Sequence, residues 1–291
     1  MQPTRIQLLF DRLKNEGRAA LIAYLTAGDP SPERTPELVA ALERGGADLI
    51  ELGVPFSDPI ADGPVIQRGA DRALKAGTTL PKVLEIARRI REKSEIPLLL
   101  FTYLNPAFQY GFERLARDMK AAGIDGCLLT DVSVEEAAQY VKIMRGIGLD
   151  TVFLAAPTST ERRLQLVAAY SSGFVYLVSR TGVTGERTAL SESVAPLIRR
   201  MRAITSTPLA VGFGISTPEQ AGAVAKMADG VVVGSAIVRL IEQHADNDGL
   251  ESFARSLRTA VGQAEACPTA GQAEACPTAG QAEACPTGSR P

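Results

Sequence analysis

The sequence predicts a (β/α)8 barrel, because eight short apolar runs alternate with amphipathic helical segments between residues 19 and 243. Most of these runs are continuously apolar, which is typical of parallel strands that are buried on both faces. The predicted strands are Ala20–Thr26, Asp48–Gly53, Pro97–Tyr103, Gly126–Thr130, Thr151–Ala155, Phe174–Ser179, Leu209–Gly212 and Gly230–Gly234.

An open, doubly wound sheet is the alternative to the barrel. Such a sheet normally has a glycine-rich dinucleotide-binding turn after its first strand. Here the first strand ends in Leu25-Thr-Ala-Gly-Asp-Pro30, which has one glycine and lacks that spacing. The barrel is therefore the favoured fold.

Amphipathic helices are predicted between the strands, and an extra helix is predicted before the first strand. Ile6, Leu9, Phe10 and Leu13 lie on one face of this N-terminal helix. Apolar faces of later helices combine Leu80, Val83, Leu84 and Ala87; Phe112, Leu115, Ala116 and Met119; and Val194, Leu197, Ile198 and Met201. The segments Ser31-Pro32-Glu33 and Ser216-Thr217-Pro218-Glu219 contain residues that start helices.

Composition excludes several classes of function. The net charge is −2, so binding to nucleic acid or to an anionic membrane has no electrostatic support. Apolar runs such as Ile96–Phe101 are too short to cross a membrane, and the N-terminus lacks the apolar core of a signal peptide. Nothing in the main body suggests a disulfide framework, so we expect a cytoplasmic protein. Cys127, the only cysteine before residue 262, is predicted to be a buried apolar residue. The single histidine, His244, has no ligand cluster around it, so no metal site is expected.

Two domains are predicted, a catalytic barrel over residues 1–261 and a low-complexity tail over residues 262–291. Gly-Gln-Ala-Glu-Ala-Cys-Pro-Thr occurs at 262–269, 271–278 and 280–287. The tail has no Leu, Ile, Val or aromatic residue, so we expect it to be disordered. Its cysteines are compatible with a weak metal or redox tract, but a tandem duplication without a role in the core function is the favoured interpretation.

Two carboxylates, Glu51 and Asp62, are the strongest candidates for chemistry. Alternation along the strand places Leu49, Glu51 and Gly53 on one face. A carboxylate in an apolar strand costs free energy unless it is paired or used. One acid inside a cavity and one on the loop above it suit proton transfer when their pKa values differ. The alternative is structural, with Glu51 capping a helix and Asp62 forming a turn.

Phosphate binding is predicted at the ends of the last two strands, where barrel enzymes often hold phosphate. Gly212-Phe-Gly-Ile-Ser216 and Gly234-Ser-Ala-Ile237 follow these strands, and glycine allows backbone N–H groups to approach an anion. Both segments are also compatible with ordinary turns. The polar segment 179–188 suits a mobile lid, in which Thr184 and Gly185 offer a hydroxyl and an N–H; a plain surface loop is the alternative.

Four motifs together resemble those of the tryptophan synthase alpha subunit family. They are the 51–64 segment Glu-Leu-Gly-Val-Pro-Phe-Ser-Asp-Pro-Ile-Ala-Asp-Gly-Pro, then Arg-Thr-Gly-Val-Thr-Gly, Gly-Phe-Gly-Ile-Ser and Gly-Ser-Ala-Ile-Val. The resemblance covers Ile6 to Leu257. It implies a (β/α)8 barrel that acts as a carbon–carbon lyase and cleaves indole-3-glycerol phosphate to indole and glyceraldehyde 3-phosphate. It also implies no cofactor in this chain, and a beta subunit that carries pyridoxal phosphate, receives the indole and forms an alpha2beta2 assembly.

The resemblance also implies roles for individual residues. Glu51 corresponds to the general acid–base, and Asp62 to the group that accepts a hydrogen bond from the indole N–H and stabilises the developing positive charge. The implied phosphate-binding residues are Gly185, Gly214, Gly234 and Ser235. The implied indole pocket and lid comprise Tyr24, Phe101, Leu128, Tyr176, Thr184, Phe213 and Val232. Relatives often differ at Tyr24 and Phe101, which affects the shape of the pocket rather than the reaction.

Three other functions are alternatives to the one that the resemblance implies. A stand-alone indole-3-glycerol-phosphate lyase would use the same chemistry, but the 53–62 loop and Asn105-Pro106 resemble partner-contacting surfaces. A non-catalytic activating partner would lack the carboxylates, and both Glu51 and Asp62 are present. A metal-dependent sugar-phosphate barrel enzyme would need histidine ligands, which the single His244 does not provide.

Overall fold

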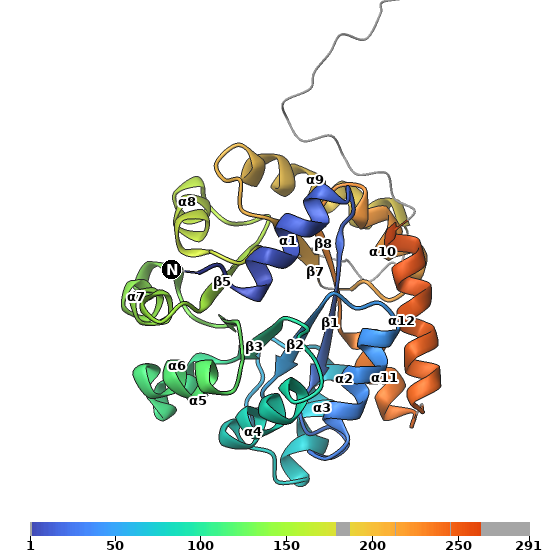
Figure 1. Ribbon diagram of the computed structural model, residues 1–291. Helices are drawn as coiled ribbons and strands as arrows, with labels where there is room; N and C mark the ends of the chain where they lie inside the picture. Colours follow the sequence, from blue (N-terminus) through green and yellow to red (C-terminus); the bar gives the residue numbers. More distant parts are fainter. Residues whose placement is uncertain (1, 179–186, 213, 245, 263–291) are drawn as a thin grey trace, which may run out of the picture.

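The computed structural model describes residues 2–178, 187–212, 214–244 and 246–262, and these residues form a closed parallel barrel in the order β1 to β8. Figure 1 shows the helices surrounding the barrel. Because β1 pairs with both β2 and β8, the open-sheet alternative is wrong and the predicted barrel is confirmed. The strands are β1 Ala20–Thr26, β2 Leu49–Gly53, β3 Leu98–Thr102, β4 Gly126–Leu129, β5 Asp150–Ala155, β6 Val175–Val178, β7 Leu209–Gly212 and β8 Gly230–Val233.

The predicted strands agree with the observed ones to within one residue at each described end. The differences lie at strand ends, where hydrogen bonds to other partners replace the pairing between strands. Asp48, for example, precedes β2, and its side chain accepts a hydrogen bond from the Leu21 N–H. Ser179, the predicted end of the sixth strand, lies outside the described residues.

The predicted helical segments are present on the outside of the barrel. The helices are α1 Arg5–Asn15, α2 Thr35–Arg44, α3 Pro64–Lys75, α4 Leu80–Arg91, α5 Leu104–Tyr110, α6 Phe112–Ala121, η1 Val134–Glu136, α7 Ala138–Gly146, α8 Glu161–Tyr170, α9 Arg187–Arg202, α10 Pro218–Ala225, α11 Ser235–Glu242 and α12 Asn247–Gly262. Their predicted apolar faces are buried, apart from the partly buried Phe112. Thr217 caps α10 with a capping box, as expected, but α2 begins only at Thr35 because Ser31 to Arg34 form a hydrogen-bonded turn.

Strand alternation divides the apolar residues into two clusters. Leu49 and Leu99 point into the barrel, whereas Ile50 and Leu52 pack outward under the helices. In the lateral register, Glu51 lies between Tyr24 on β1 and Leu99 on β3. Glu51 therefore faces the barrel interior, on the same strand face as Leu49.

Helix α1 closes the N-terminal end of the barrel (Figure 1). Ile6, Leu9, Phe10 and Leu13 are all buried in the interior cluster, as their common face predicted. The ring of Phe10 lies 5.7 Å from that of Phe174. The described interior at this end is therefore filled with packed side chains.

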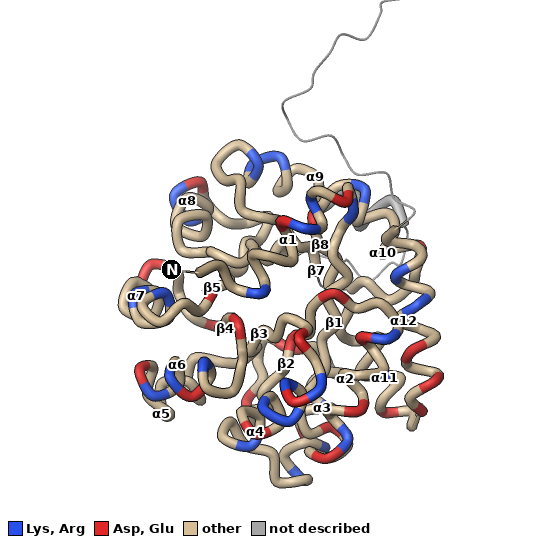
Figure 2. Tube along the Cα trace, in the orientation of Figure 1, with Lys and Arg blue, Asp and Glu red and all other residues tan. Residues whose placement is uncertain are grey.

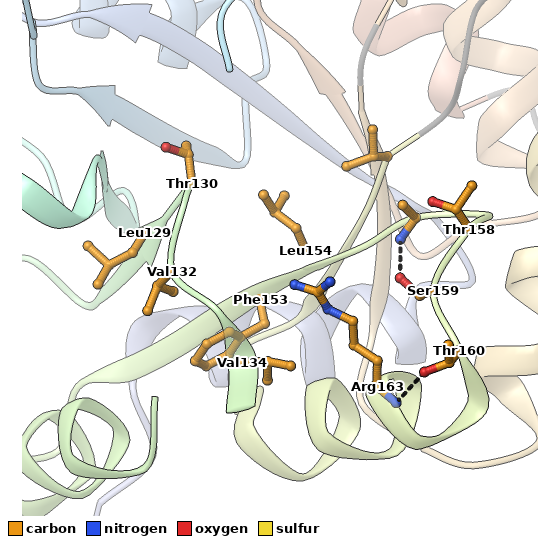
Figure 3. Close-up of a pocket in the computed structure, with 12 residues that line it drawn as sticks. Leu129, Thr130, Val132, Val134, Phe153, Leu154, Thr158, Ser159, Thr160 and Arg163 are labelled. Carbon is orange, nitrogen blue, oxygen red and sulfur yellow. Dashed lines mark hydrogen bonds between the residues drawn. The ribbon is translucent and has the colours of Figure 1, made fainter. Parts of the chain in front are cut away.

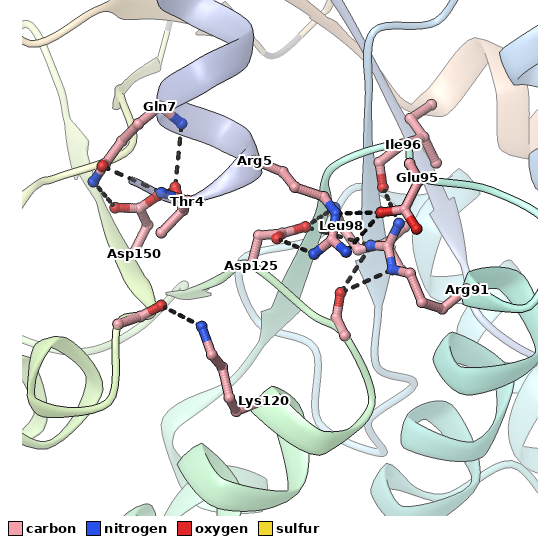
Figure 4. A network of polar contacts seen from close by, with 12 residues as sticks. Thr4, Arg5, Gln7, Arg91, Glu95, Ile96, Leu98, Lys120, Asp125 and Asp150 are labelled. Carbon is pink, nitrogen blue, oxygen red and sulfur yellow. Dashed lines mark hydrogen bonds and ion pairs between the residues drawn. The ribbon is translucent and has the colours of Figure 1, made fainter. Parts of the chain in front are cut away.

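A polar network fastens this same end (Figure 4). Thr4 and Gln7 donate hydrogen bonds to Asp150, while Arg5 and Arg91 converge on Asp125. Aspartates also bind the N–H groups at the starts of neighbouring strands, as Asp125 does with Leu98 and Asp229 with Leu209. These acids are occupied by structural partners, which leaves the opposite end of the barrel as the place for chemistry.

Both signs of charge are interspersed over the outer helices (Figure 2). This distribution agrees with the small net charge of −2. Within the described residues, no helix has the length and apolar character needed to cross a membrane.

Candidate active site

A cavity of about 130 Å³ opens at the C-terminal ends of the strands and contains both candidate carboxylates. It is lined by Tyr24, Glu51, Asp62, Gly63, Ile66, Phe101, Tyr176, Gly214, Ile215, Val232, Gly234 and Ser235. Most of the residues proposed from sequence for the indole and phosphate sites therefore surround one space. Gly63, Ile66 and Ile215 were not anticipated.

Glu51 is completely buried at the floor of this cavity. Neither carboxylate oxygen has a hydrogen-bond partner among the described residues. Burial without a compensating partner raises the Glu51 pKa from 4.5 to about 8. Glu51 is thus protonated at neutral pH and is poised to donate a proton.

The surroundings of Glu51 explain this shift. Tyr24 and Phe101 form an aromatic wall, with ring centroids 5.1 Å apart in an edge-to-face arrangement. Each of these two side chains is only 7% exposed. An apolar wall of this kind excludes water and disfavours the ionised carboxylate.

Asp62 lies on the loop between β2 and α3 and is held by Tyr103. The Tyr103 hydroxyl donates to Asp62 Oδ2 at 2.9 Å and accepts the Ala61 N–H at 3.1 Å. Burial raises the pKa of Asp62, while the Tyr103 hydrogen bond opposes that rise. The two acids are therefore in different environments, as a proton-transfer pair requires.

Tyr103 was missed by the sequence analysis as a site residue. Its position in the sequence could have indicated this role. Tyr103 follows β3 and lies two residues after Phe101, so strand alternation directs it to the same side as Phe101, which faces the cavity. Its ring also packs on Phe56, with centroids 5.1 Å apart. Tyr103 thereby ties the 54–63 loop to the end of β3.

The phosphate end of the cavity is formed by glycines and a helix start. Gly214 has a φ of +84°, and Gly234 immediately precedes α11. No described side chain caps the start of α11, so its first N–H groups are available to an anion. A Cβ at Gly234 would lie 3.3 Å from the Tyr24 side chain, so the glycine also permits close packing there.

Some residues proposed from sequence do not reach this cavity. Leu128 is fully buried in the barrel interior beside Phe101 and does not line the space. It lies in register with Phe101 in the same interior cluster, and its role as a pocket residue stays a prediction. Thr184, Gly185 and Phe213 lie outside the described residues.

A second cavity of about 300 Å³ lies over the ends of β4, β5 and β6 (Figure 3). Arg163 extends across it from the start of α8 toward Leu154, and Thr160 accepts the Arg163 backbone N–H. Arg163 is the one ionisable side chain among its described lining residues, and it is exposed. This cavity is larger but lacks a buried acid, so the cavity with Glu51 is the better candidate for catalysis.

Comparison with known proteins agrees with this geometry. The profile of the family "Tryptophan synthase alpha chain" matches residues 10–267. The tryptophan synthase alpha chain of Solibacter usitatus (strain Ellin6076) is 70% identical over 263 residues, which cover 89% of this chain and 98% of that protein. The chain belongs to the tryptophan synthase alpha chain family. A second member, from Geotalea uraniireducens (strain Rf4), is 50% identical over 261 residues, with coverage of 89% and 98%.

Solved structures of tryptophan synthase also share the fold. The alpha subunit from Legionella pneumophila str. Paris has a TM-score of 0.82 and 37% identity, covering 89% of this chain and 99% of that one. A tryptophan synthase structure from Mycobacterium tuberculosis has a TM-score of 0.83 and 36% identity, with the same coverage. Membership of the tryptophan synthase alpha chain family is therefore supported by both sequence and structure.

The first prediction concerns Glu51 and stability. Because the folded state holds the Glu51 proton more tightly than the unfolded chain, the contribution of Glu51 to stability is fully present below pH 4.5 and is lost as the pH rises to about 8. Glu51→Gln removes the charge, so it should be about 5 kcal/mol more stable than the wild type above pH 8 and differ little near pH 4. Denaturant unfolding at both pH values measures this. Glu113→Gln, at an exposed position on α6, is the control, and an equal gain at both pH values would contradict the argument.

The second prediction concerns Tyr103. Tyr103→Phe removes the hydrogen bond that opposes the burial effect, so the pKa of Asp62 should rise further. Carbon-13 NMR titration of the Asp62 carboxyl measures the shift. Tyr110→Phe is a matched control, since Tyr110 donates to Asp118 away from the cavity. An unchanged Asp62 pKa in Tyr103→Phe would show that the hydrogen bond has no electrostatic effect.

Proposed function

We propose that this chain is the alpha subunit of a tryptophan synthase and that it cleaves indole-3-glycerol phosphate to indole and glyceraldehyde 3-phosphate. The reaction makes the chain a carbon–carbon lyase, and it needs no cofactor of the chain's own. The observation that carries the proposal is the buried Glu51, which has no partner in the described part of the chain and shares one cavity with Asp62 and a glycine-rich helix start. Membership of the alpha chain family supports it.

Glu51 performs the first proton transfer. Its carboxylic acid, which is protonated at neutral pH, donates a proton to C3 of the indole ring. The ring becomes a cation with a positive charge shared by its nitrogen. Asp62 accepts the indole N–H in a hydrogen bond, and its negative charge stabilises this cation.

The resulting Glu51 carboxylate then acts as the base. It removes the proton from the hydroxyl on the glycerol carbon attached to C3. The carbon–carbon bond breaks as that carbon becomes an aldehyde, and its electron pair returns to the ring and neutralises the cation. Indole and glyceraldehyde 3-phosphate are released, and Glu51 has regained its proton.

The other residues of the cavity position the substrate. The backbone N–H groups at Gly214, Gly234 and Ser235 bind the phosphate, aided by the partial positive charge at the start of α11. Tyr24, Phe101 and Val232 enclose the apolar indole ring, and Tyr176 lies beside the carboxylates. Holding both ends of the substrate brings C3 to Glu51 and the ring nitrogen to Asp62. Gly185 and Thr184 belong to the proposed lid and phosphate loop.

A beta subunit that carries pyridoxal phosphate is the proposed partner, in an alpha2beta2 assembly within the cytoplasm. Two large apolar side chains are exposed on the segments that follow β2 and β3, Ile60 at 85% and Phe108 at 64%. Ile60 lies in the 53–62 loop, and Phe108 lies on α5, which contains Asn105-Pro106; this loop and this dipeptide are the segments that resemble partner-contacting surfaces. Exposed apolar residues of this kind favour a docking surface over the stand-alone lyase.

The carboxylates provide the main test of the proposed function. Glu51→Gln should lower the rate of indole release by about 10²-fold or more while retaining substrate binding, since an amide keeps the shape but transfers no proton. Asp62→Asn should lose a similar factor, because it removes the charge facing the cation. Steady-state turnover together with thermal melting separates these effects from unfolding. A folded Glu51→Gln protein with near-normal turnover would refute the mechanism.

The partner is tested by adding a beta subunit. We expect indole release to accelerate, because docking at Ile60 and Phe108 would order the loop that carries Asp62. Ile60→Ser with Phe108→Ser should weaken the acceleration, whereas Leu8→Ser, at an exposed residue on α1, should not. Equal turnover with and without the partner at saturating substrate would favour the stand-alone lyase.

A further inference from the structure

Two helices carry the two ends of the candidate site at their N-termini. Asp62 and Gly63 lead directly into α3, which starts at Pro64, and Gly234 leads into α11, which starts at Ser235. The relative placement of α3 and α11 therefore sets the distance between the acid at the indole end and the anion-binding groups at the phosphate end.

A cluster of four charged side chains joins these helices. Arg72 on α3 makes a paired contact with Asp29, with Nε to Oδ1 and Nη2 to Oδ2 both at 2.8 Å. Its remaining nitrogen, Nη1, donates to Glu242 Oε1 on α11 at 2.9 Å. Arg68 on α3 donates to the same Glu242 at 2.6 and 2.8 Å. One guanidinium thus connects α3, α11 and the loop after β1.

Close backbone packing lies directly beside this cluster. A Cβ added at Gly69 on α3 would be 2.9 Å from Val238 Cγ1 on α11 and 3.1 Å from Asp29 Oδ2. Such distances do not accommodate a larger residue without movement. The helices are therefore in contact at Gly69, and the arginine fixes their alignment one turn further along α3.

Arg72 favours the ionised form of two carboxylates, those of Asp29 and Glu242. Asp29 is fully buried, and desolvation raises its pKa against the opposing effect of Arg72. The hydrogen bond from Arg68, together with Arg72, lowers the pKa of Glu242 to about 2, so this carboxylate stays ionised. A planar guanidinium satisfies both acids at fixed angles, which an ammonium group cannot do.

We propose that Arg72 is a positioning residue that keeps the acid at the start of α3 in register with the phosphate-binding start of α11. The inference rests on the proposed function, because the register matters only for a substrate that has an indole ring at one end and a phosphate at the other. A ligand that occupies one end alone does not sense it. This difference separates positioning from simple stabilisation.

The first experiment compares two glutamates with matched contacts. Glu242 is paired with Arg68 and Arg72, and Glu251 on α12 is paired with Arg44 and Arg255. Their side chains are similarly exposed, at 26% and 20%, but Glu251 joins α2 to α12 and neither helix carries a site residue at its start. Glu242→Gln should lower kcat/KM for indole-3-glycerol phosphate, whereas Glu251→Gln should leave it unchanged. Equal effects of the two variants would refute the proposal.

The second experiment removes the guanidinium without leaving a buried charge. Arg72→Met alone strands the Asp29 carboxylate and is expected to destabilise the fold. Combining it with Asp29→Asn removes that charge and should restore much of the melting temperature. The double variant of the full chain should still lose about tenfold or more in kcat/KM, because small misplacements of reacting groups are costly.

Binding of half-ligands completes the test. Inorganic phosphate alone and indole alone should bind the double variant within about twofold of the wild type, as expected when only their mutual register is lost. Weaker binding of either half-ligand, or normal cleavage by the double variant, would overturn the positioning role. A wild-type protein that fails to cleave indole-3-glycerol phosphate would instead overturn the proposed function itself.

Discussion

The site is organised around a buried carboxylate that has no hydrogen-bond partner among the described residues. Burial raises the Glu51 pKa to about 8, so the folded barrel holds this side chain protonated at neutral pH, which costs about 3 kcal/mol relative to the unfolded chain, where the group is ionised. The rest of the barrel has to supply that free energy. It does so by burying the apolar faces of the strands and helices, including the aromatic wall of Tyr24 and Phe101 beside the acid.

The two ends of the barrel use their charges differently. At the N-terminal end, acids such as Asp125 and Asp150 accept backbone or side-chain hydrogen bonds and hold α1 in place. At the C-terminal end, Glu51 has no described partner and Asp62 has one hydroxyl donor. Satisfied acids stabilise the fold, whereas unsatisfied ones retain the proton affinity that catalysis requires.

Asp62 and the start of α11 are held in position by contacts that lie outside the cavity. Tyr103 holds the loop of Asp62 against the end of β3, and Arg72 with Glu242 joins α3 to α11. These contacts set where Asp62 and Ser235 lie without taking part in chemistry. Rigid supports of this kind reduce the reorganisation that substrate binding must drive.

The sequence by itself determined the barrel, its strand boundaries and the inward direction of Glu51, because hydrophobic periodicity is a local property of the chain. It also indicated the family through the 51–64 motif. Only the tertiary structure decided that Tyr103 meets Asp62 and that Arg72 joins Asp29 to Glu242. The hydrogen-bonded residues are separated by 41 to 170 positions in the sequence. Whether such distant residues meet depends on how the strands and helices pack, which no local pattern encodes.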